Sequence, residues 1–295
     1  MCRHIAYLGP VEPLGRLLVE PPQGLYRQSW APGRQRYGTV NADGFGVGWY
    51  APYDPVPARY RRAGPIWADQ SFADLARVVR TRALLAAVRD ATLTGADAEA
   101  AAAPFTAGTW LFSHNGAVTG WPGSLARAAA LLPTRELLSL EARNDSALVW
   151  ALVLHRLRAG AAREPGRGTA VVPTPGAGGR RTGPGHTAGR ALADTVREVA
   201  AAAPGSRLNL LLTDGEAIAA TAWGDTLWYL ARPRGGTVVA SEPYDEDPRW
   251  REVPDRTLLV ASRTTVRLTP LEEPGGAAPA PAPASPSAAV KESRT

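Results

Sequence analysis

The chain is poor in several residue types, and each shortage excludes certain structural features or classes of protein. Cys2 is the only cysteine among 295 residues, so an internal disulfide is impossible and a cytoplasmic location is expected. The start of the chain lacks the apolar core of a secretory signal peptide, and no apolar run approaches the roughly 18 residues that a membrane-spanning helix requires. We therefore expect no membrane partner.

Lysine is almost absent, because Lys291 is the only one and arginine supplies nearly all of the positive charge behind a formal net charge of +6. An excess of arginine can indicate nucleic-acid binding. Here the arginines are scattered, and their densest group falls in the Gly-, Pro- and Thr-rich stretch 162–190, which is typical of a flexible insert. We expect no nucleic-acid partner, and a non-enzymatic arginine-rich binding protein stays a remote alternative.

Methionine also occurs once, and Met1 stands directly before Cys2. Removal of Met1 would leave a thiol and a free α-amine on the same residue. The thiolate is the reactive form of cysteine, and an α-amine titrates at roughly 7.7 to 8.0, so this residue would carry a nucleophile together with its base. A small buried apolar residue is the alternative for a lone cysteine. Cys2 is thus a candidate catalytic nucleophile.

Alternating apolar patterns at both ends of the chain predict strands, and amphipathic patterns in the middle predict helices. The predicted strands are 2–8, 44–50, 84–89, 109–113, 208–213, 217–223, 226–231 and 237–241, and the predicted helices are 71–80, 145–158 and 191–203. This order favours an antiparallel α+β layered fold over a parallel doubly wound one. The Ala-, Pro- and Ser-rich stretch 272–295 is expected to be a disordered tail.

Asn115 and Gly116 follow the strand predicted at 109–113. An amide side chain and an adjacent backbone N–H can converge on one point, which is what a developing oxyanion requires. Asn-Gly is also the strongest short signal for a hairpin turn, so both interpretations stay open at this point.

Arg89 and Asp145 are candidate binding residues for a zwitterionic group. Arg89 ends a predicted strand and could clamp a carboxylate, or it could form a surface ion pair. Asp145 could bind an ammonium group, cap the helix that it begins, or do both. His4 shares a strand face with Cys2 and could tune the thiol or simply form a hydrogen bond in the core. No metal-ligand spacing is present, and we expect neither a metal nor a cofactor.

Five motifs occur together in an order that resembles class II glutamine amidotransferase-like proteins, which are N-terminal nucleophile hydrolases. They are Met1-Cys2-Arg3-His4 and the stretches 41–50, 88–92, 113–116 and 144–146. The resemblance runs from Cys2 to about Leu271 and implies one domain over 2–271 with a four-layer α-β-β-α sandwich. Because the stretch after Leu271 is too poor in large apolar residues to fold, we expect no second, ammonia-using domain.

The resemblance also implies a site. The implied catalytic residues are Cys2, Asn115 and Gly116, and the implied substrate-binding residues are Arg89, Thr92 and Asp145. In this family the cysteine forms a thioester with a γ-glutamyl group, the Asn-Gly pair stabilises the oxyanion, and the arginine and aspartate hold the α-carboxylate and the α-ammonium. The oligomeric state is left open.

Within the family, the chain is similar to the branch that hydrolyses the γ-glutamyl amide of γ-glutamyl-hercynylcysteine S-oxide in ergothioneine biosynthesis. This similarity rests on the residues 2–4, 28–30 and 101–105. Relatives that act on glutathione-like peptides usually carry Asn and His where this chain has Ala101 and Ala103. Hydrolysis of glutamine or of glutathione-like peptides remains the alternative.

Three aromatic residues stand close in sequence to the predicted site, namely Trp30, Trp49 and Tyr50. Aromatic faces attract quaternary ammonium groups, such as the trimethylated amine of a hercynyl group. We therefore expect a preference for a substrate whose remote end carries this cation.

Overall fold

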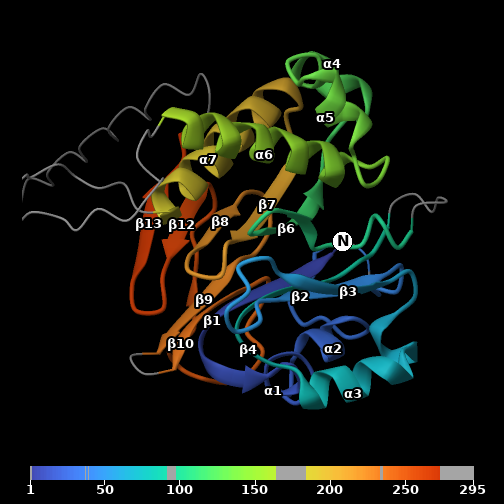
Figure 1. Ribbon diagram of the computed structural model, residues 1–295, viewed down its shortest axis with the longest axis vertical. Helices are drawn as coiled ribbons and strands as arrows, with labels where there is room; N and C mark the ends of the chain where they lie inside the picture. Colours follow the sequence, from blue (N-terminus) through green and yellow to red (C-terminus); the bar gives the residue numbers. More distant parts are fainter. Residues whose placement is uncertain are drawn as a thin grey trace, which may run out of the picture.

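Two antiparallel sheets pack face to face, and helices cover the outer face of each sheet (Figure 1). This computed structural model describes residues 2–36, 38, 40–91, 98–163, 184–232 and 235–272. The four layers confirm the predicted α-β-β-α sandwich.

The first sheet has seven strands and carries the beginning of the chain near its centre. Its order is β11 (Arg251–Glu252), β9 (Trp228–Arg232), β10 (Gly236–Ala240), β1 (Arg3–Pro13), β4 (Arg80–Val88), β2 (Phe45–Trp49) and β3 (Ala58–Arg62). Alternation along β1 sends Ile5 and Tyr7 into one apolar cluster and Ala6 and Leu8 into another. The first cluster lies under the helices α1 (Leu14–Leu18), α2 (Leu25–Gln28) and α3 (Gln70–Val78). Residues Cys2 and His4 therefore face the second sheet.

The second sheet has six strands and supports the longest helices. Its order is β13 (Val266–Pro270), β12 (Thr257–Ala261), β8 (Ile218–Ala222), β7 (Arg207–Thr213), β6 (Trp110–Ala117) and β5 (Phe105–Ala107). Helices α6 (Asp145–Arg163) and α7 (Pro184–Ala202) cover it, with the short helices α4 (Ala126–Ala129) and α5 (Thr134–Leu138) beyond (Figure 1). The short helix η2 (Gly123–Leu125) contacts α4 and α7, and η1 (Ile66–Ala68) places Ile66 in the apolar cluster under α1 to α3. Helix α6 buries Leu148, Val149, Leu152 and Val153, the helical spacing that its sequence predicts.

Several boundaries differ from those expected. Asn115 and Gly116 lie inside β6, which pairs with β7 through Ala117, so the hairpin-turn alternative is wrong. Helix α7 begins at Pro184, so residues 184–190 of the predicted insert are helical, as are 162–163 at the end of α6. The rest of that insert and the tail from 273 onward lie outside the described residues. Strands β12 and β13 had no prediction.

The layer between the sheets is apolar and combines alanines with larger aliphatic side chains. Five of its buried members are alanines, namely Ala6, Ala83, Ala220, Ala222 and Ala261. Toward the start of β1 this layer becomes polar, with buried His4, Ser113, Asn115 and Ser241. Buried polar groups cost free energy unless they form hydrogen bonds, so this end of the sandwich is a candidate location for a functional site.

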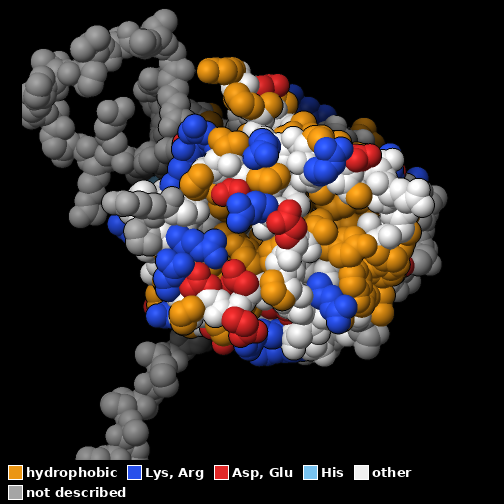
Figure 2. Space-filling view, turned by 90° about the horizontal axis from the view of Figure 1, so that it is seen from below, with side chains coloured by type: hydrophobic (Ala, Val, Ile, Leu, Met, Phe, Trp, Pro, Cys, Tyr) orange, Lys and Arg blue, Asp and Glu red, His pale blue; other side chains and the backbone are white. Residues whose placement is uncertain are grey.

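Charge on the outer surface is mixed. On the face that α1 to α3 cover, basic and acidic side chains are interspersed (Figure 2). Arg77 lies 3.0 Å from Asp74, and Arg16 lies 3.9 Å from Glu12. Such pairs neutralise the arginine charge locally on this face.

Candidate active site

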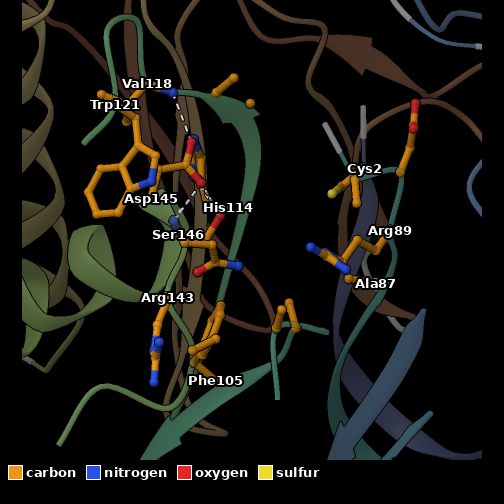
Figure 3. A pocket seen from close by; sticks show the side chains of 18 of the residues that line it. Cys2, Ala87, Arg89, Phe105, His114, Val118, Trp121, Arg143, Asp145 and Ser146 are labelled. Carbon is orange, nitrogen blue, oxygen red and sulfur yellow. Dashed lines mark hydrogen bonds between the residues drawn. The ribbon is translucent and has the colours of Figure 1, made fainter. Parts of the chain in front are cut away.

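A cavity of about 580 Å³ opens at the polar end of the sandwich, between the start of β1 and the side formed by β6 and α6 (Figure 3). It brings together four residues from distant parts of the chain: Cys2, Arg89, Gly116 and Asp145. Cys2 and Arg89 belong to the wall built by the first sheet, whereas Gly116 and Asp145 belong to the opposite wall.

Cys2 lies immediately before β1, and its thiol points toward the cavity (Figure 3). Burial raises the pKa of this thiol, while the Asp90 backbone N–H and the nearby Arg89 guanidinium act in the opposite direction. The net direction is upward, so the thiol is protonated near neutral pH. Attack on a carbonyl then requires a base that removes the proton.

Arg89 follows β4 and is held by the segment that leads into β2. Its backbone N–H donates to the Gly44 carbonyl at 2.7 Å, and its Nη1 donates to the Asp43 carbonyl at 3.1 Å. The Asp43 N–H donates back to the Arg89 carbonyl at 2.9 Å, and its carboxylate accepts from the Ala91 N–H at 2.8 Å. These bonds direct a half-buried guanidinium to the cavity wall.

Asp145 begins α6 on the opposite wall, and neighbouring N–H groups fix its carboxylate. Oδ2 accepts from the Val118 N–H at 2.9 Å, and Oδ1 accepts from the Ser146 N–H at 2.7 Å. Capping of the helix falls to Asn144, whose Oδ1 accepts from the Ala147 N–H at 2.9 Å. Oδ1 also accepts from the Ser146 hydroxyl, so Oδ2 is the oxygen that keeps a lone pair for a further donor.

His114 and Ser146 extend this wall, and sequence reasoning missed both. His114 Nε2 lies 2.9 Å from the Arg207 carbonyl, which accepts only from a protonated nitrogen. Nδ1 lies 3.0 Å from Ser146 Oγ, and this hydroxyl donates to Asp145 Oδ1 at 3.2 Å. The contact joins residues 32 positions apart, so no local pattern reveals it.

Asn115 and Gly116 lie on opposite faces of β6. Gly116 lines the cavity, and a Cβ at this position would lie 1.9 Å from the Arg207 carbonyl oxygen, so only glycine fits. Asn115 is fully buried and is not among the residues that line the cavity. Its Nδ2 makes one long contact of 3.4 Å with Ser241 Oγ, and its Oδ1 has no hydrogen-bond partner among the described residues. The amide thus lies behind the cavity with free hydrogen-bonding capacity.

His4 is a buried core residue that joins the two sheets. Its Nδ1 lies 3.1 Å from Ser113 Oγ, and burial lowers the pKa of the ring to about 3. It is therefore neutral at physiological pH, in keeping with a hydrogen-bonded core histidine. Thr92, the remaining predicted site residue, lies outside the described residues.

The aromatic residues expected at the site are elsewhere. Trp30 packs edge-on against Tyr26 and Trp67, and the Tyr50 hydroxyl donates to two backbone carbonyls. Trp49 packs against the apolar cluster under α1 to α3, and none of these three residues lines the cavity. The aromatic side chains that line it are Trp121 and Phe105. Closeness in sequence to a site residue does not show that a residue lines the cavity, because successive strand residues point to opposite faces of the sheet.

In the described part of the chain, no group of three or more His, Cys, Asp or Glu side chains could hold a metal ion. Among the described residues, no helix combines the length and the apolar character needed to cross a membrane.

Solved structures define the class of fold. A glutamine aminotransferase class-II domain protein from Silicibacter pomeroyi matches with a TM-score of 0.60 at 21% identity, covering 92% of this chain and 100% of that one. Glutamine phosphoribosylpyrophosphate amidotransferase from B. subtilis matches with a TM-score of 0.55 at 13% identity, covering 92% of this chain and 49% of that one. The chain has the fold of class II glutamine amidotransferases.

Sequence comparison identifies the family within this class of fold. A protein of Mycolicibacterium smegmatis named gamma-glutamyl-hercynylcysteine sulfoxide hydrolase is 40% identical over 271 residues, which are 92% of this chain and 100% of the relative. A protein of the same name from Mycobacterium tuberculosis is 39% identical over 277 residues, 94% of this chain and 99% of the relative. No family model matches the chain. The chain belongs to the family of gamma-glutamyl-hercynylcysteine sulfoxide hydrolases.

Proposed function

We propose that this protein hydrolyses the γ-glutamyl amide bond of γ-glutamyl-hercynylcysteine S-oxide and releases glutamate and hercynylcysteine S-oxide. One observation carries the proposal: Cys2, Arg89, Gly116 and Asp145 converge on one cavity in a chain that is 40% identical to a relative of that name. The cavity offers a thiol, a cation and an anion, which are the three groups that a γ-glutamyl amide requires.

Recognition of the glutamyl end uses both walls. The Arg89 guanidinium matches the planar shape of the α-carboxylate and can bind it through two parallel hydrogen bonds. The Asp145 carboxylate, held by Val118 and Ser146, accepts from the α-ammonium with the remaining lone pair of Oδ2. Thr92 would assist nearby, as in the family. Together these contacts fix the γ-carbonyl carbon in front of Cys2.

The chemical step is acyl transfer through a thioester. Because burial keeps the thiol protonated, the free α-amine of Cys2, exposed by removal of Met1, takes the proton directly or through a water molecule. A carbon–sulfur bond forms, the carbonyl oxygen becomes negative, and the Gly116 N–H and the Asn115 amide stabilise it. Collapse breaks the carbon–nitrogen bond, and the α-ammonium returns the proton to the leaving amine. Water then hydrolyses the thioester, which frees glutamate and the thiol.

An aromatic face is available for the remote cation of the substrate. Trp121 lines the cavity on the same wall as Asp145 (Figure 3). A quaternary ammonium over an indole ring gains about 0.5 to 2 kcal/mol. The trimethylated substrate should therefore be preferred several-fold over its counterpart without the methyl groups.

A panel of γ-glutamyl compounds tests the function. Glutamate release would be measured with γ-glutamyl-hercynylcysteine S-oxide, its des-trimethyl counterpart, glutathione and glutamine at equal enzyme concentration. We expect the highest kcat/KM with the first compound. Equal or faster cleavage of glutathione or glutamine would contradict the proposed substrate and favour a generic γ-glutamyl amidohydrolase.

A further inference from the structure

The cavity contains a second arginine, Arg143, which the recognition of the glutamyl group does not use. This inference rests on the proposed function, because it takes Arg89 and Asp145 as partners of the glutamyl α-carboxylate and α-ammonium. With these two assigned, Arg143 is a further arginine that lines the cavity.

Arg143 stands on the wall opposite Arg89. It precedes Asn144 and Asp145 in the segment that leads into α6, whereas Arg89 follows β4 on the other side of the cavity (Figure 3). The helix cap formed by Asn144 fixes the backbone next to Arg143, so its position relative to Asp145 is well defined. A single glutamyl carboxylate held by Arg89 is thus on the far side from Arg143.

Exposure indicates which part of the substrate reaches Arg143. Its side chain is exposed to solvent, whereas Cys2 and Asp145 are partly buried and Ala142 beside it is buried. Arg143 therefore lies at the mouth of the cavity. The glutamyl end must be deep enough to reach Cys2 with its γ-carbon, so the part of the substrate that extends to the mouth is the leaving group.

Much of the remaining lining is apolar. Small apolar residues, Ala98, Ala101 and Ala103, line this side together with Phe105. In a γ-glutamyl amino acid, the carbon next to the scissile nitrogen carries a carboxylate. An arginine matches such a carboxylate in charge and in shape, whereas an apolar lining offers it nothing.

We propose that Arg143 binds the leaving-group carboxylate next to the scissile nitrogen, so that the enzyme selects γ-glutamyl amino acids over γ-glutamyl alkylamines. Arg143 is then a specificity-determining residue. It acts on the half of the substrate that departs, whereas Arg89 acts on the half that becomes the thioester.

The test compares two substrates that differ only in this carboxylate: γ-glutamyl-hercynylcysteine S-oxide and its analogue built on cysteamine in place of cysteine. For the unaltered enzyme we expect kcat/KM to favour the carboxylate by about 10- to 100-fold, the range of a charge-assisted hydrogen bond. Arg143→Gln should lower kcat/KM for the full substrate to the level of the analogue and leave the analogue unchanged. Turnover of the analogue also shows that the variant is folded.

A matched control is Arg127→Gln, because Arg127 is an exposed arginine in α4 that does not line the cavity. This control should keep the full preference. Dissociation constants of both compounds, measured on Cys2→Ala forms with and without Arg143→Gln, should show the same pattern without turnover.

Two results would overturn the inference. One is a preference for the carboxylate that survives in Arg143→Gln. The other is an equal loss of kcat/KM with both compounds, which would show that Arg143 binds the betaine carboxylate or supports the folded structure instead. Failure of the proposed function looks different. In that case the unaltered enzyme would release no glutamate from either compound.

Discussion

The two walls of the cavity are held in place by different means. On the first wall, most of the hydrogen bonds that hold the structure are made by the backbone. Strand β1 pairs with β4, with Arg3 opposite Val88, and the main-chain carbonyls of Asp43 and Gly44 accept hydrogen bonds from Arg89. On the second wall, side chains bond to one another and to the main chain, as Asp145, Ser146 and His114 do. Substitutions on the first wall should therefore change the chemistry with little effect on stability, whereas those on the second wall should change both.

The largest effect is expected at Cys2 on the first wall. Cys2→Ala removes the nucleophile and should lower kcat by about 10⁴- to 10⁶-fold, as loss of a catalytic nucleophile does elsewhere. Substrate binding and thermal unfolding should change little. Glutamate release, calorimetric binding and the melting temperature check these points. Intact mass gives a second check, since a fully active preparation that retains Met1 would contradict the α-amine as base.

Asn115 tests whether the amide behind the cavity takes part in catalysis. Asn115→Ala should lower kcat by about 10²- to 10³-fold if the amide donates to the oxyanion. Asn209, directly opposite in β7 and equally buried, is the matched control. Its side chain bonds to Asp225, Thr226 and Trp223 main-chain atoms, so Asn209→Ala should lower the free energy of unfolding and leave kcat intact. Unchanged kcat in Asn115→Ala would leave Gly116 as the proposed oxyanion donor.

Substitutions of Arg89 and Asp145 allow a direct comparison of the two walls in KM and in the free energy of unfolding. Arg89→Lys keeps the charge and loses the two-pronged geometry, so KM should rise about 10- to 100-fold with no change in the free energy of unfolding. Asp145→Ala should raise KM similarly and also lower the free energy of unfolding by about 1 to 3 kcal/mol, because the Val118 N–H loses its acceptor. Urea unfolding beside steady-state kinetics measures both. Equal stability of the two variants would contradict the comparison.

The smallest effect on catalysis is expected at His4, which joins the sheets behind both walls. Its pKa of about 3 in the folded protein lies below the ordinary value near 6.5, so the unfolded chain takes up the proton first as pH falls. The stabilisation is complete above about pH 6.5 and is lost toward pH 3, by at most about 1.4 kcal/mol per pH unit. Urea unfolding between pH 7 and pH 4 should show a shallower decline for His4→Gln than for the unaltered protein. Parallel curves would contradict this role.

Local sequence patterns predicted most elements of the fold because strand alternation and helix spacing are local properties. The strand at the start of the chain, the 44–50 strand and the helix from Asp145 all form where expected. Alternation also predicted that Cys2 and His4 share a face. What local patterns could not give is pairing partners, and so Asn115 and Gly116, a strong turn signal, lie inside a strand that β7 extends.

The residues of the candidate site were also only partly predictable from local sequence patterns. Family motifs pointed to Cys2, Arg89, Gly116 and Asp145, and the structure places all four on one cavity, while their roles remain predictions. Trp121, Arg143 and the His114–Ser146 contact were missed because each depends on packing between segments that are distant along the chain. The sequence carries no short-range sign of such contacts.

The alanines between the sheets have a consequence for catalytic precision. Face-to-face sheets lie about 10 Å apart, and their separation depends on the side chains between them. Ala6 and Ala83 come from the sheet that bears Cys2, and Ala220 and Ala222 from the sheet that bears Gly116. The gap between the proposed nucleophile and the proposed oxyanion donor is therefore set partly by alanine methyl groups outside the cavity lining. In evolution, a single larger side chain in this layer would increase the separation of the two sheets and so change the geometry of the cavity. Residues of the interior can therefore affect the reaction without lining the cavity.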